Sequence, residues 1–551
     1  MDRLFQTNVI RKKTSLDGMW DVSIPGKGNF TVPVPGCWEQ IPALSCFRGK
    51  GVYTKTITTT HKSSLKLNFK GVSHTGEVYF DGVQVGHHYN AFTPFSVIVP
   101  HVEAGKHTIK VEVDNTFGAH SALHVPNDYY TYGGITRPVT LEYIANTWIS
   151  YVHFTPKYAE GTWSGNIEVC IRNISHKPFS GQLQCTLGQT CISINVEASA
   201  NSQTVVSSEA EFPDVAAWSA NTPNLYLLNT VLWQDGEAID DLIERVGFRT
   251  VSVKGEKIYV NDEEIYFKGF NRHEDHPVYG CALPLQAMAH DMDLMLDTGA
   301  NAVRTSHYPN DERFLDLCDE RGVFVWEENH ARGLSLERMQ NPNFDKQCED
   351  CIYEMVTNHF NHPSIIIWGL LNECASQTEI GKEKYKQQFA QLRSLDSSRP
   401  NSFASCQHFS DICFDLPDII SMNLYPLWYD NSDPSETLTK EKDWAQTVGG
   451  AGKPFIVSEY GAGAVYGNRS DTCARWTEER QKQILDTVIG SYMNRDDLAG
   501  IFLWQFCDCR VTEEEWFMVR PNTRNNKGIV DGYRRKKLAY DTVKAHYQKK
   551  K

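Results

Sequence analysis

The chain has 551 residues, which is too long for a single hydrophobic core and predicts about two to four domains. Its formal net charge of −14 argues against nucleic acid as a partner, because that binding depends on neutralising phosphates with Lys and Arg. No run of about 18 apolar residues is present, so no membrane span is expected. The N-terminal stretch carries charge without an apolar core, which predicts no signal peptide.

The 15 cysteines are scattered and odd in number. Cys507 and Cys509 are too close for a usual disulfide bridge, and Cys348 and Cys351 form a lone pair at metal-like spacing with no second pair following. We therefore expect reduced thiols, no metal site and a cytoplasmic protein.

Residues 1–146 alternate between apolar and polar side chains, as strands with one buried face do. Residues 65–69 and 107–113 are clear examples, and turn dipeptides such as Asp81-Gly82 separate such segments. This region predicts a jelly-roll β-sandwich that resembles a sugar-binding domain. Residues 147–253 continue to alternate, for example over 166–172, and predict an immunoglobulin-like β-sandwich.

From residue 254 to residue 551, short apolar runs alternate with longer amphipathic stretches. Eight such runs in about 300 residues predict a catalytic (β/α)8 TIM barrel. The whole chain is therefore predicted to be multidomain, with two β-sandwiches followed by a barrel. The predicted barrel strands are residues 265–270, 302–305, 323–326, 365–371, 403–405, 419–424, 455–458 and 500–506.

Polar or aromatic side chains follow seven of these eight runs. A single glutamate at a strand end is more often a solvated loop residue than a catalytic one. Barrel enzymes, however, place their chemistry at the C-terminal ends of the strands, so convergence of seven such ends predicts an active site. The segments are 271–275, 304–309, 327–330, 372–373, 423–425, 459–461 and 504–506.

Glu373 follows the fourth run and Glu459 follows the seventh, so the two carboxyl groups are expected to face each other across the barrel mouth. Glycoside cleavage needs such a pair, one protonated to help the aglycone leave and one ionised to attack or stabilise the anomeric carbon. A separation of about 5–5.5 Å gives retention of configuration, and a wider gap gives inversion. The residues alone leave both outcomes open.

These motifs resemble glycoside hydrolase family 2 over nearly the whole chain. The resemblance implies a retaining mechanism, with Glu373 as acid/base and Glu459 as nucleophile. It also implies that Asn372 binds the sugar 2-hydroxyl. The motifs that carry the resemblance are residues 16–20, 132–138, 218–226, 247–249, 271–275, 304–309, 368–373 and 458–461, and the implied sugar-lining residues are His307, Tyr425 and Trp504.

Residues 525–528, Asn-Asn-Lys-Gly, resemble the Asn-x-Lys motif of β-glucuronidases. The resemblance implies that Asn525 and Lys527 hold a sugar carboxylate, with Asp128 and Tyr429 nearby. An amide and a cation give charge-assisted hydrogen bonds to carboxylate oxygens, which a neutral hexose cannot replace. Arg520 and Arg524 are further candidates for this contact, although solvated loop charges are an equally good interpretation.

The segment after the third run departs from the family pattern. His330 and Arg332 are hydrogen-bond donors at positions where β-glucuronidases carry small apolar groups. Donors there could recognise an axial C4 hydroxyl, so β-D-galacturonides are as plausible as β-D-glucuronides. The short stretch 333–345 also predicts an open entrance for large aglycones.

The sequence therefore predicts a retaining exo-β-hexuronidase that acts on a small-molecule uronide without a cofactor. The resemblance also implies a homo-oligomer. One alternative is a neutral-sugar β-galactosidase or β-mannosidase of the same family. Another, of a different class, is a non-catalytic carbohydrate-binding protein.

Overall fold

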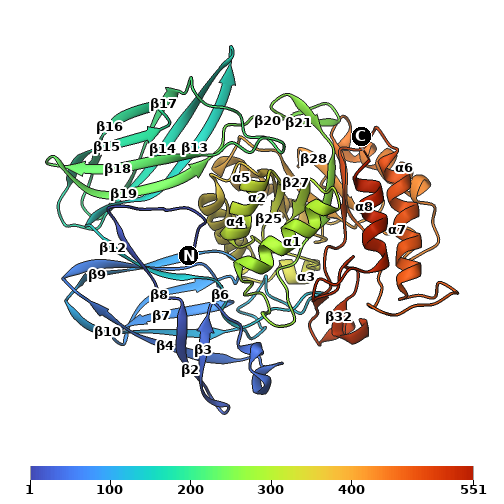
Figure 1. The fold of residues 1–551 in the computed structure, drawn as a ribbon, viewed down its shortest axis with the longest axis horizontal. Coiled ribbons are helices and arrows are strands. Elements are labelled where there is room, and N and C mark those ends of the chain that lie inside the picture. Colours follow the sequence, from blue (N-terminus) through green and yellow to red (C-terminus); the bar gives the residue numbers. More distant parts are fainter. Residues whose placement is uncertain (1, 550–551) are drawn as a thin grey trace.

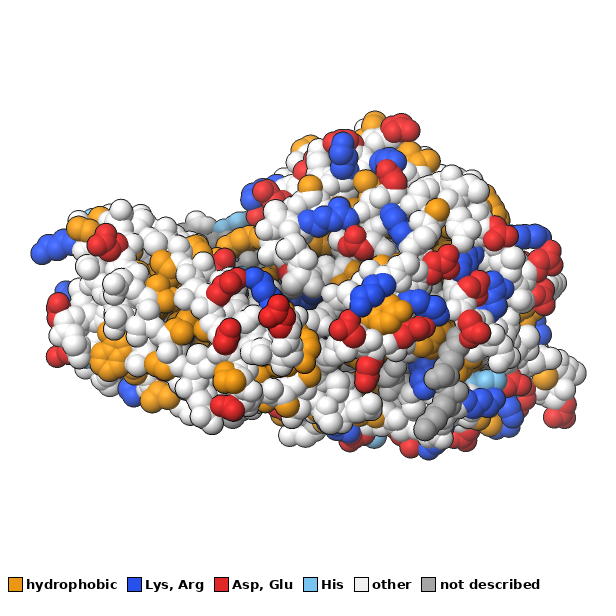
Figure 2. Space-filling view, turned by 90° about the horizontal axis from the view of Figure 1, so that it is seen from above, with side chains coloured by type: hydrophobic (Ala, Val, Ile, Leu, Met, Phe, Trp, Pro, Cys, Tyr) orange, Lys and Arg blue, Asp and Glu red, His pale blue; other side chains and the backbone are white. Residues whose placement is uncertain are grey.

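A computed structural model describes residues 2–549; Met1, Lys550 and Lys551, which belong to the predicted first and third domains, lie outside the described residues. Figure 1 shows two β-sandwiches, coloured blue and green, lying against a barrel coloured from yellow to red. In the described part of the chain, no helix has the length and apolar character needed to cross a membrane. On the face shown in Figure 2, acidic and basic side chains are intermingled.

The N-terminal sandwich is built from a four-stranded and a six-stranded antiparallel sheet. Leu65, Leu67 and Phe69 are completely buried while Lys66 and Asn68 between them are partly exposed, so the predicted alternation is confirmed. The sheets comprise β1 (Lys12–Ser15), β12 (Val139–Ile144), β5 (Ser63–Phe69) and β9 (Phe95–Val102), and then β3 (Gly28–Val34), β2 (Gly18–Ile24), β4 (Lys50–Thr59), β10 (Gly105–Asp114), β7 (Thr75–Phe80) and β8 (Val83–Tyr89), with β6 (Val72–Ser73) paired to β11 (Gly134–Ile135) beside them.

The second sandwich has a three-stranded and a four-stranded sheet around a separate apolar core. This confirms an immunoglobulin-like sandwich after the first one. Its strands are β13 (Thr147–Ala159), β14 (Thr162–Asn173) and β17 (Ser202–Glu211) in one sheet, and β16 (Thr190–Ala198), β15 (Phe179–Leu187), β18 (Tyr226–Gln234) and β19 (Glu237–Val246) in the other, followed by the small sheet β20 (Val251–Lys254), β21 (Lys257–Val260) and β22 (Glu263–Ile265).

Eight parallel strands form a closed barrel, as predicted, with the first strand paired to the last. The first predicted run begins too early, because Ile265 pairs antiparallel with Ile258 in the preceding hairpin. The barrel strands are β23 (Phe267–Asn271), β24 (Ala302–Arg304), β25 (Phe324–Glu328), β26 (Ile365–Leu370), β27 (Asn401–Ser405), β28 (Ile419–Asn423), β29 (Phe455–Tyr460) and β30 (Gly500–Leu503).

The barrel helices begin and end at sequence signals. The helix α2 starts after Asp311, whose side chain accepts a hydrogen bond from the Arg313 N–H, and stops at Gly322 with φ of 66°. The α-helices are α1 (Leu285–Asp297), α2 (Glu312–Arg321), α3 (Leu336–Met339), α4 (Phe344–His359), α5 (Glu379–Leu395), α6 (Pro434–Ala445), α7 (Glu478–Met493) and α8 (Leu538–Tyr547), and the late pair β31 (Cys509–Arg510) and β32 (Arg524–Asn525) lies beyond β30.

Three buried histidine rings in contact join the first sandwich to the barrel. The ring centroids of His74 and His124 are 4.5 Å apart, and those of His124 and His330 are 4.2 Å apart. Burial lowers the pKa of His74 and of His330 to about 3, and it also lowers the pKa of His124. The folded protein therefore holds these rings neutral at pH values where a solvated histidine would be protonated.

We expect these three histidines to make the stability of the folded protein depend on pH. The unfolded chain binds protons near the ordinary histidine pKa of about 6.5, whereas the folded chain does not. The contribution of these histidines to the free energy of unfolding is thus fully present above about pH 6.5 and is lost as the pH falls toward about 3. Melting temperatures measured from about pH 7 to about pH 4.5 should fall, and less steeply in a His330→Phe variant. His176→Phe, at an exposed histidine, should keep the wild-type slope; equal slopes in all three proteins would contradict this expectation.

Candidate active site

A cavity of about 500 Å³ opens where the C-terminal ends of the barrel strands meet. Its volume is in the range of small-molecule sites. Eight of the predicted site residues line it, namely Asp128, Arg332, Glu373, Tyr425, Tyr429, Glu459, Trp504 and Lys527, together with Cys406, His408, Phe409, Asn423, Leu424, Pro426, Asp430, Ser432, Thr437, Lys440, Glu441, Trp516 and Arg520.

Glu459 lies near the end of β29 and is almost fully buried. Its carboxylate accepts hydrogen bonds from Arg304 Nη1 at 3.0 Å and from the Tyr425 hydroxyl at 2.6 Å. Burial, followed by the neighbouring charge of Glu373, raises the pKa of Glu459 to about 6, while Arg304 and Tyr425 oppose that rise. The two donors therefore stabilise an ionised carboxylate, the state that a nucleophile requires.

Glu373 lies three residues beyond β26 with a left-handed backbone, φ of 53°, which is uncommon for a residue other than glycine. Asn423 Nδ2 donates to its carboxylate at 2.9 Å, and Arg332 Nη2 lies 3.3 Å from the other oxygen. Its backbone N–H is held by the Ala404 carbonyl at 2.9 Å. The side chain remains partly accessible in the cavity, as a proton donor to a bound substrate must be.

Arg304, at the end of β24, links Glu459 to Asn372 and Glu328, a role that the sequence did not reveal. Its guanidinium donates to Glu459, to Asn372 Oδ1 at 2.8 Å and to Glu328 at 2.6 Å. Burial opposes its charge, but the carboxylates of Glu328 and Glu459 outweigh burial and raise its pKa. Among the described residues, Asn372 Nδ2 has no hydrogen-bond partner, so a buried amide donor next to Glu373 is unpaired.

Glu328 orients His307 beneath the cavity. The carboxylate lies 2.8 Å from His307 Nδ1, and burial raises the pKa of Glu328 to about 7 despite the adjacent Arg304. The imidazole stacks on Trp504 at 4.9 Å between ring centroids, and its Nε2 lies 3.9 Å from Glu459. Burial lowers the pKa of His307, so the ring is neutral and presents Nε2 toward the site.

Cationic and amide groups lie at another part of the cavity. Lys527 is 1% exposed, and its ammonium donates to the Tyr429 hydroxyl at 3.0 Å. Burial lowers the pKa of Lys527. Asn525 Nδ2 and Arg520 Nε each donate to Asp128 at 3.0 Å. Arg520 therefore joins this group, and Asp128 holds Asn525 and Arg520 in place.

Four predicted site residues stand behind the cavity lining. Asn372 accepts a hydrogen bond from Arg304, His307 lies 3.9 Å from Glu459, and Asn525 contacts Asp128. His330 points elsewhere: its Nε2 lies 3.0 Å from the Tyr129 hydroxyl, and its ring packs on His124. Arg524, the other open candidate, does not line the cavity and lies 4.0 Å from Asp275.

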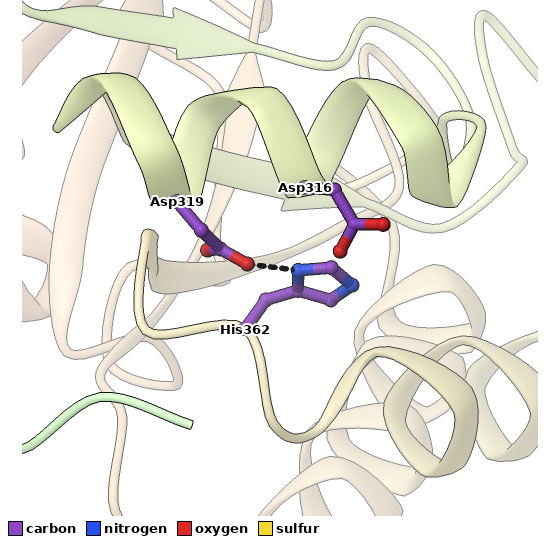
Figure 3. Close-up of side chains that lie close together, drawn as sticks. All are labelled: Asp316, Asp319 and His362. Carbon is purple, nitrogen blue, oxygen red and sulfur yellow. Dashed lines mark hydrogen bonds and ion pairs between the residues drawn. The ribbon is translucent and has the colours of Figure 1, made fainter. Parts of the chain in front are cut away.

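One buried group has the composition of a metal site outside this cavity. Asp316 and Asp319 project from the same side of α2 toward His362, as Figure 3 shows. Two guanidinium groups already engage Asp316, since Arg3 donates to both carboxylate oxygens and Arg245 lies 3.2 Å away. A metal cation would be repelled by these charges. We interpret the group as an ionic anchor that joins the N-terminal segment and the second sandwich to α2.

The hydrogen bond from Tyr425 should control the acidic limb of the pH profile. With Glu459 as the expected nucleophile, which acts in its ionised form, kcat/KM should fall as the pH drops through about 6. Tyr425→Phe removes one donor to the carboxylate, so the limb should move to higher pH and kcat/KM at pH 6 should fall about tenfold. The control is Tyr466→Phe, at a tyrosine outside the cavity. An unshifted limb in Tyr425→Phe would refute the assignment.

The mouth of this (β/α)8 barrel holds two interacting carboxyl groups, one held ionised and one accessible to a leaving group. Such a pair defines a glycoside hydrolase. The chain belongs to glycosyl hydrolases family 2. Residues 12–144 match the sugar binding domain of that family, and residues 251–551 match its TIM barrel domain. Residues 147–249, between them, match a further domain named simply glycosyl hydrolases family 2.

Relatives and solved structures agree with this assignment. The chain is 28% identical to a beta-glucuronidase of Streptococcus agalactiae over 534 residues, which cover 88% of this chain and 86% of that protein. A GH2 beta-galacturonidase from Eisenbergiella tayi bound to galacturonate is similar with a TM-score of 0.97 at 47% identity, covering 100% of this chain and 99% of that chain. A beta-D-glucuronidase of Dictyoglomus thermophilum has a TM-score of 0.86 at 25% identity, with 100% and 99% coverage.

Proposed function

We propose that this protein is a retaining exo-β-hexuronidase that prefers β-D-galacturonides to β-D-glucuronides. The observation that carries the proposal is one cavity that holds both Glu373 and Glu459 together with the buried ammonium of Lys527. The likeness to a beta-galacturonidase at 47% identity supports the choice of sugar.

Two displacements at the anomeric carbon give the reaction. Glu459 attacks that carbon while Glu373 delivers its proton to the glycosidic oxygen, which releases the aglycone and leaves a covalent glycosyl-enzyme. Glu373, now ionised, takes a proton from water, which attacks the same carbon and frees Glu459. Asn372 Nδ2, held by the contact of its oxygen with Arg304, donates to the 2-hydroxyl, where a contact strengthens in the transition state.

The uronic carboxylate pairs with Lys527. This ammonium is buried and donates to the neutral Tyr429 hydroxyl rather than to a carboxylate. A substrate carboxylate would supply the missing counter-ion and accept a charge-assisted hydrogen bond. A neutral hexose would leave the buried ammonium without a counter-ion, which explains the proposed preference over a β-galactosidase or β-mannosidase activity.

Arg332 is proposed to recognise the configuration at C4. Its Nη1 donates to Asn127 at 2.9 Å, its Nη2 lies beside Glu373, and its Nε has no hydrogen-bond partner within residues 2–549. In a β-D-galacturonide the axial C4 hydroxyl points to the ring face that carries the glycosidic oxygen, which is the oxygen that Glu373 protonates. We propose that the unpaired Nε of Arg332 donates to this axial hydroxyl, a contact that an equatorial C4 hydroxyl, directed away from that face, does not make.

Arg332→Ala is accordingly expected to change the preference between the two sugars. Because Arg332 also touches Glu373, both substrates should lose activity, so the informative quantity is the ratio of kcat/KM for the p-nitrophenyl galacturonide to that for the glucuronide. That ratio should fall about tenfold or more. Arg172→Ala, at an exposed arginine on β14 of the second sandwich, should leave the ratio unchanged. An unchanged ratio in Arg332→Ala would remove this residue from C4 recognition.

A panel of four p-nitrophenyl glycosides tests the proposal directly: the β-D-galacturonide, β-D-glucuronide, β-D-galactoside and β-D-mannoside. We expect turnover in that order, with the two uronides well ahead of the neutral sugars. Turnover of the neutral sugars alone would overturn the proposal.

The proposal includes a cytoplasmic homo-oligomer. All 15 cysteines carry free thiols, which supports a reducing compartment. Light scattering of the purified protein measures the oligomeric state, and a monomeric mass would refute that part.

A further inference from the structure

The outer half of the cavity has residues that the proposed reaction does not use. Phe409 and Trp516 line it and are more than half exposed, at 55% and 52%. Both rings thus present accessible aromatic surface to the cavity that holds Glu373 and Glu459.

Phe409 lines the cavity with a backbone conformation that is unfavourable for a bulky residue. It follows β27 in the loop that also carries Cys406 and His408, and its φ is 55°, in the left-handed region that bulky residues avoid. Its ring packs against Trp444 with 5.5 Å between centroids, which leaves the other side open. Strained residues of this kind occur at ligand-binding sites, where the strain maintains a required position.

Trp516 belongs to a separate element, the short 3-10 helix η4 (Glu515–Val519). The Glu515 carboxylate accepts a hydrogen bond from Arg338 at 2.7 Å, which ties this helix to the barrel. The Arg520 guanidinium lies 5.3 Å from the Trp516 ring centroid and also pairs with Asp128. The indole is thus positioned by the same arginine that borders the sugar carboxylate site.

Two polar side chains around these rings, His408 and Lys440, already have partners. His408 Nδ1 lies 2.8 Å from Glu441, and Lys440 Nζ lies 2.6 Å from Glu436. The loop that carries His408 and Phe409 follows β27, whose Ala404 carbonyl accepts a hydrogen bond from the Glu373 N–H at 2.9 Å, so this loop lies on the Glu373 side of the cavity. That is the side on which the aglycone leaves.

We infer that this outer half is the aglycone subsite and that it takes a planar aromatic aglycone, which contacts Phe409 and Trp516. The inference rests on the proposed hexuronidase function. An aromatic ring gains from contact with both side chains and needs no hydrogen bonds. A second sugar residue would have to compete with the existing pairs of His408 and Lys440 for its hydroxyl groups.

The test uses Phe409→Ala and Trp516→Ala with three substrates that share the galacturonosyl group. These are the 4-methylumbelliferyl glycoside, the methyl glycoside and a disaccharide with galactose as aglycone. Each variant should lose about tenfold in kcat/KM on the aryl substrate and less than about twofold on the other two. Hydrolysis of the glycosyl-enzyme is common to all three, so the effect belongs to the first step and to kcat/KM.

The control is Tyr158→Ala, at an exposed aromatic side chain on β13 in the second sandwich, and it should match the wild type on all substrates. If the wild type cleaves none of the three galacturonides, the proposed function fails. If it cleaves them and the two variants lose equally on aryl and methyl substrates, only the inference fails. A larger loss on the disaccharide than on the aryl substrate would identify a sugar subsite and also overturn the inference.

Discussion

Replacing Lys527 by Met is expected to lower kcat/KM on β-D-galacturonides by about 100- to 1000-fold, because an uncompensated carboxylate would then be buried against an apolar side chain. The replaced ammonium is 1% exposed, and Met has a similar length, so the cavity keeps its shape. Turnover of the corresponding neutral β-D-galactoside, which has no carboxylate to pair, should stay within about threefold of the wild type.

A matched control exists in the same cavity. Lys440 also lines it, but its ammonium is paired with Glu436 at 2.6 Å on the exposed surface of α6. Lys440→Met should therefore leave the ratio of uronide to neutral-sugar turnover unchanged. If both lysine variants lose uronide turnover equally, general electrostatic attraction accounts for recognition and the specific role of Lys527 is wrong.

The architecture is predictable from the sequence because burial leaves different patterns in its parts. Strands with one buried face alternate, as over residues 63–69, and barrel strands buried on both faces appear as continuous apolar runs, as over 365–370. The start of the first barrel run is not predictable, because Ile265 is equally suited to the hairpin strand that it joins.

The candidate site is predictable where a role depends on position along the chain. Glu373 and Glu459 follow barrel strands, and barrel topology alone brings such residues to one rim. Arg304 is also at a strand end, but its importance comes from partners on several strands. Those contacts depend on side-chain directions that no local pattern records.

Contacts between domains are the least predictable part of the site. His330 follows the third barrel strand, yet its side chain is directed to Tyr129 and His124 of the first sandwich. Arg520 pairs with Asp128 across 392 positions of sequence. Both outcomes depend on how the sandwich docks on the barrel, which periodicity within either domain cannot reveal.

Glu459 and Glu373 are expected to respond differently to loss of their charge, because we propose different roles for them. Glu459→Gln should lower kcat/KM about 10⁴-fold or more on every glycoside, because the proposed glycosyl-enzyme forms on this carboxylate. Glu373→Gln should lower it about 10²- to 10⁴-fold on a substrate with a poor leaving group, such as the methyl glycoside. The second-step contribution of Glu373 as a base is common to all substrates and does not enter kcat/KM.

The leaving group separates the two roles. A 2,4-dinitrophenyl galacturonide releases a stable phenolate without protonation, so Glu373→Gln should keep kcat/KM on it within about tenfold of the wild type, while Glu459→Gln should not. Asp430→Asn changes another carboxylate that lines the cavity and pairs with Ser432, and it should behave as the wild type on both substrates. If Glu373→Gln loses as much kcat/KM on the dinitrophenyl substrate as on the methyl glycoside, Glu373 is not the proton donor. Activity retained by Glu459→Gln would exclude a covalent intermediate at Glu459.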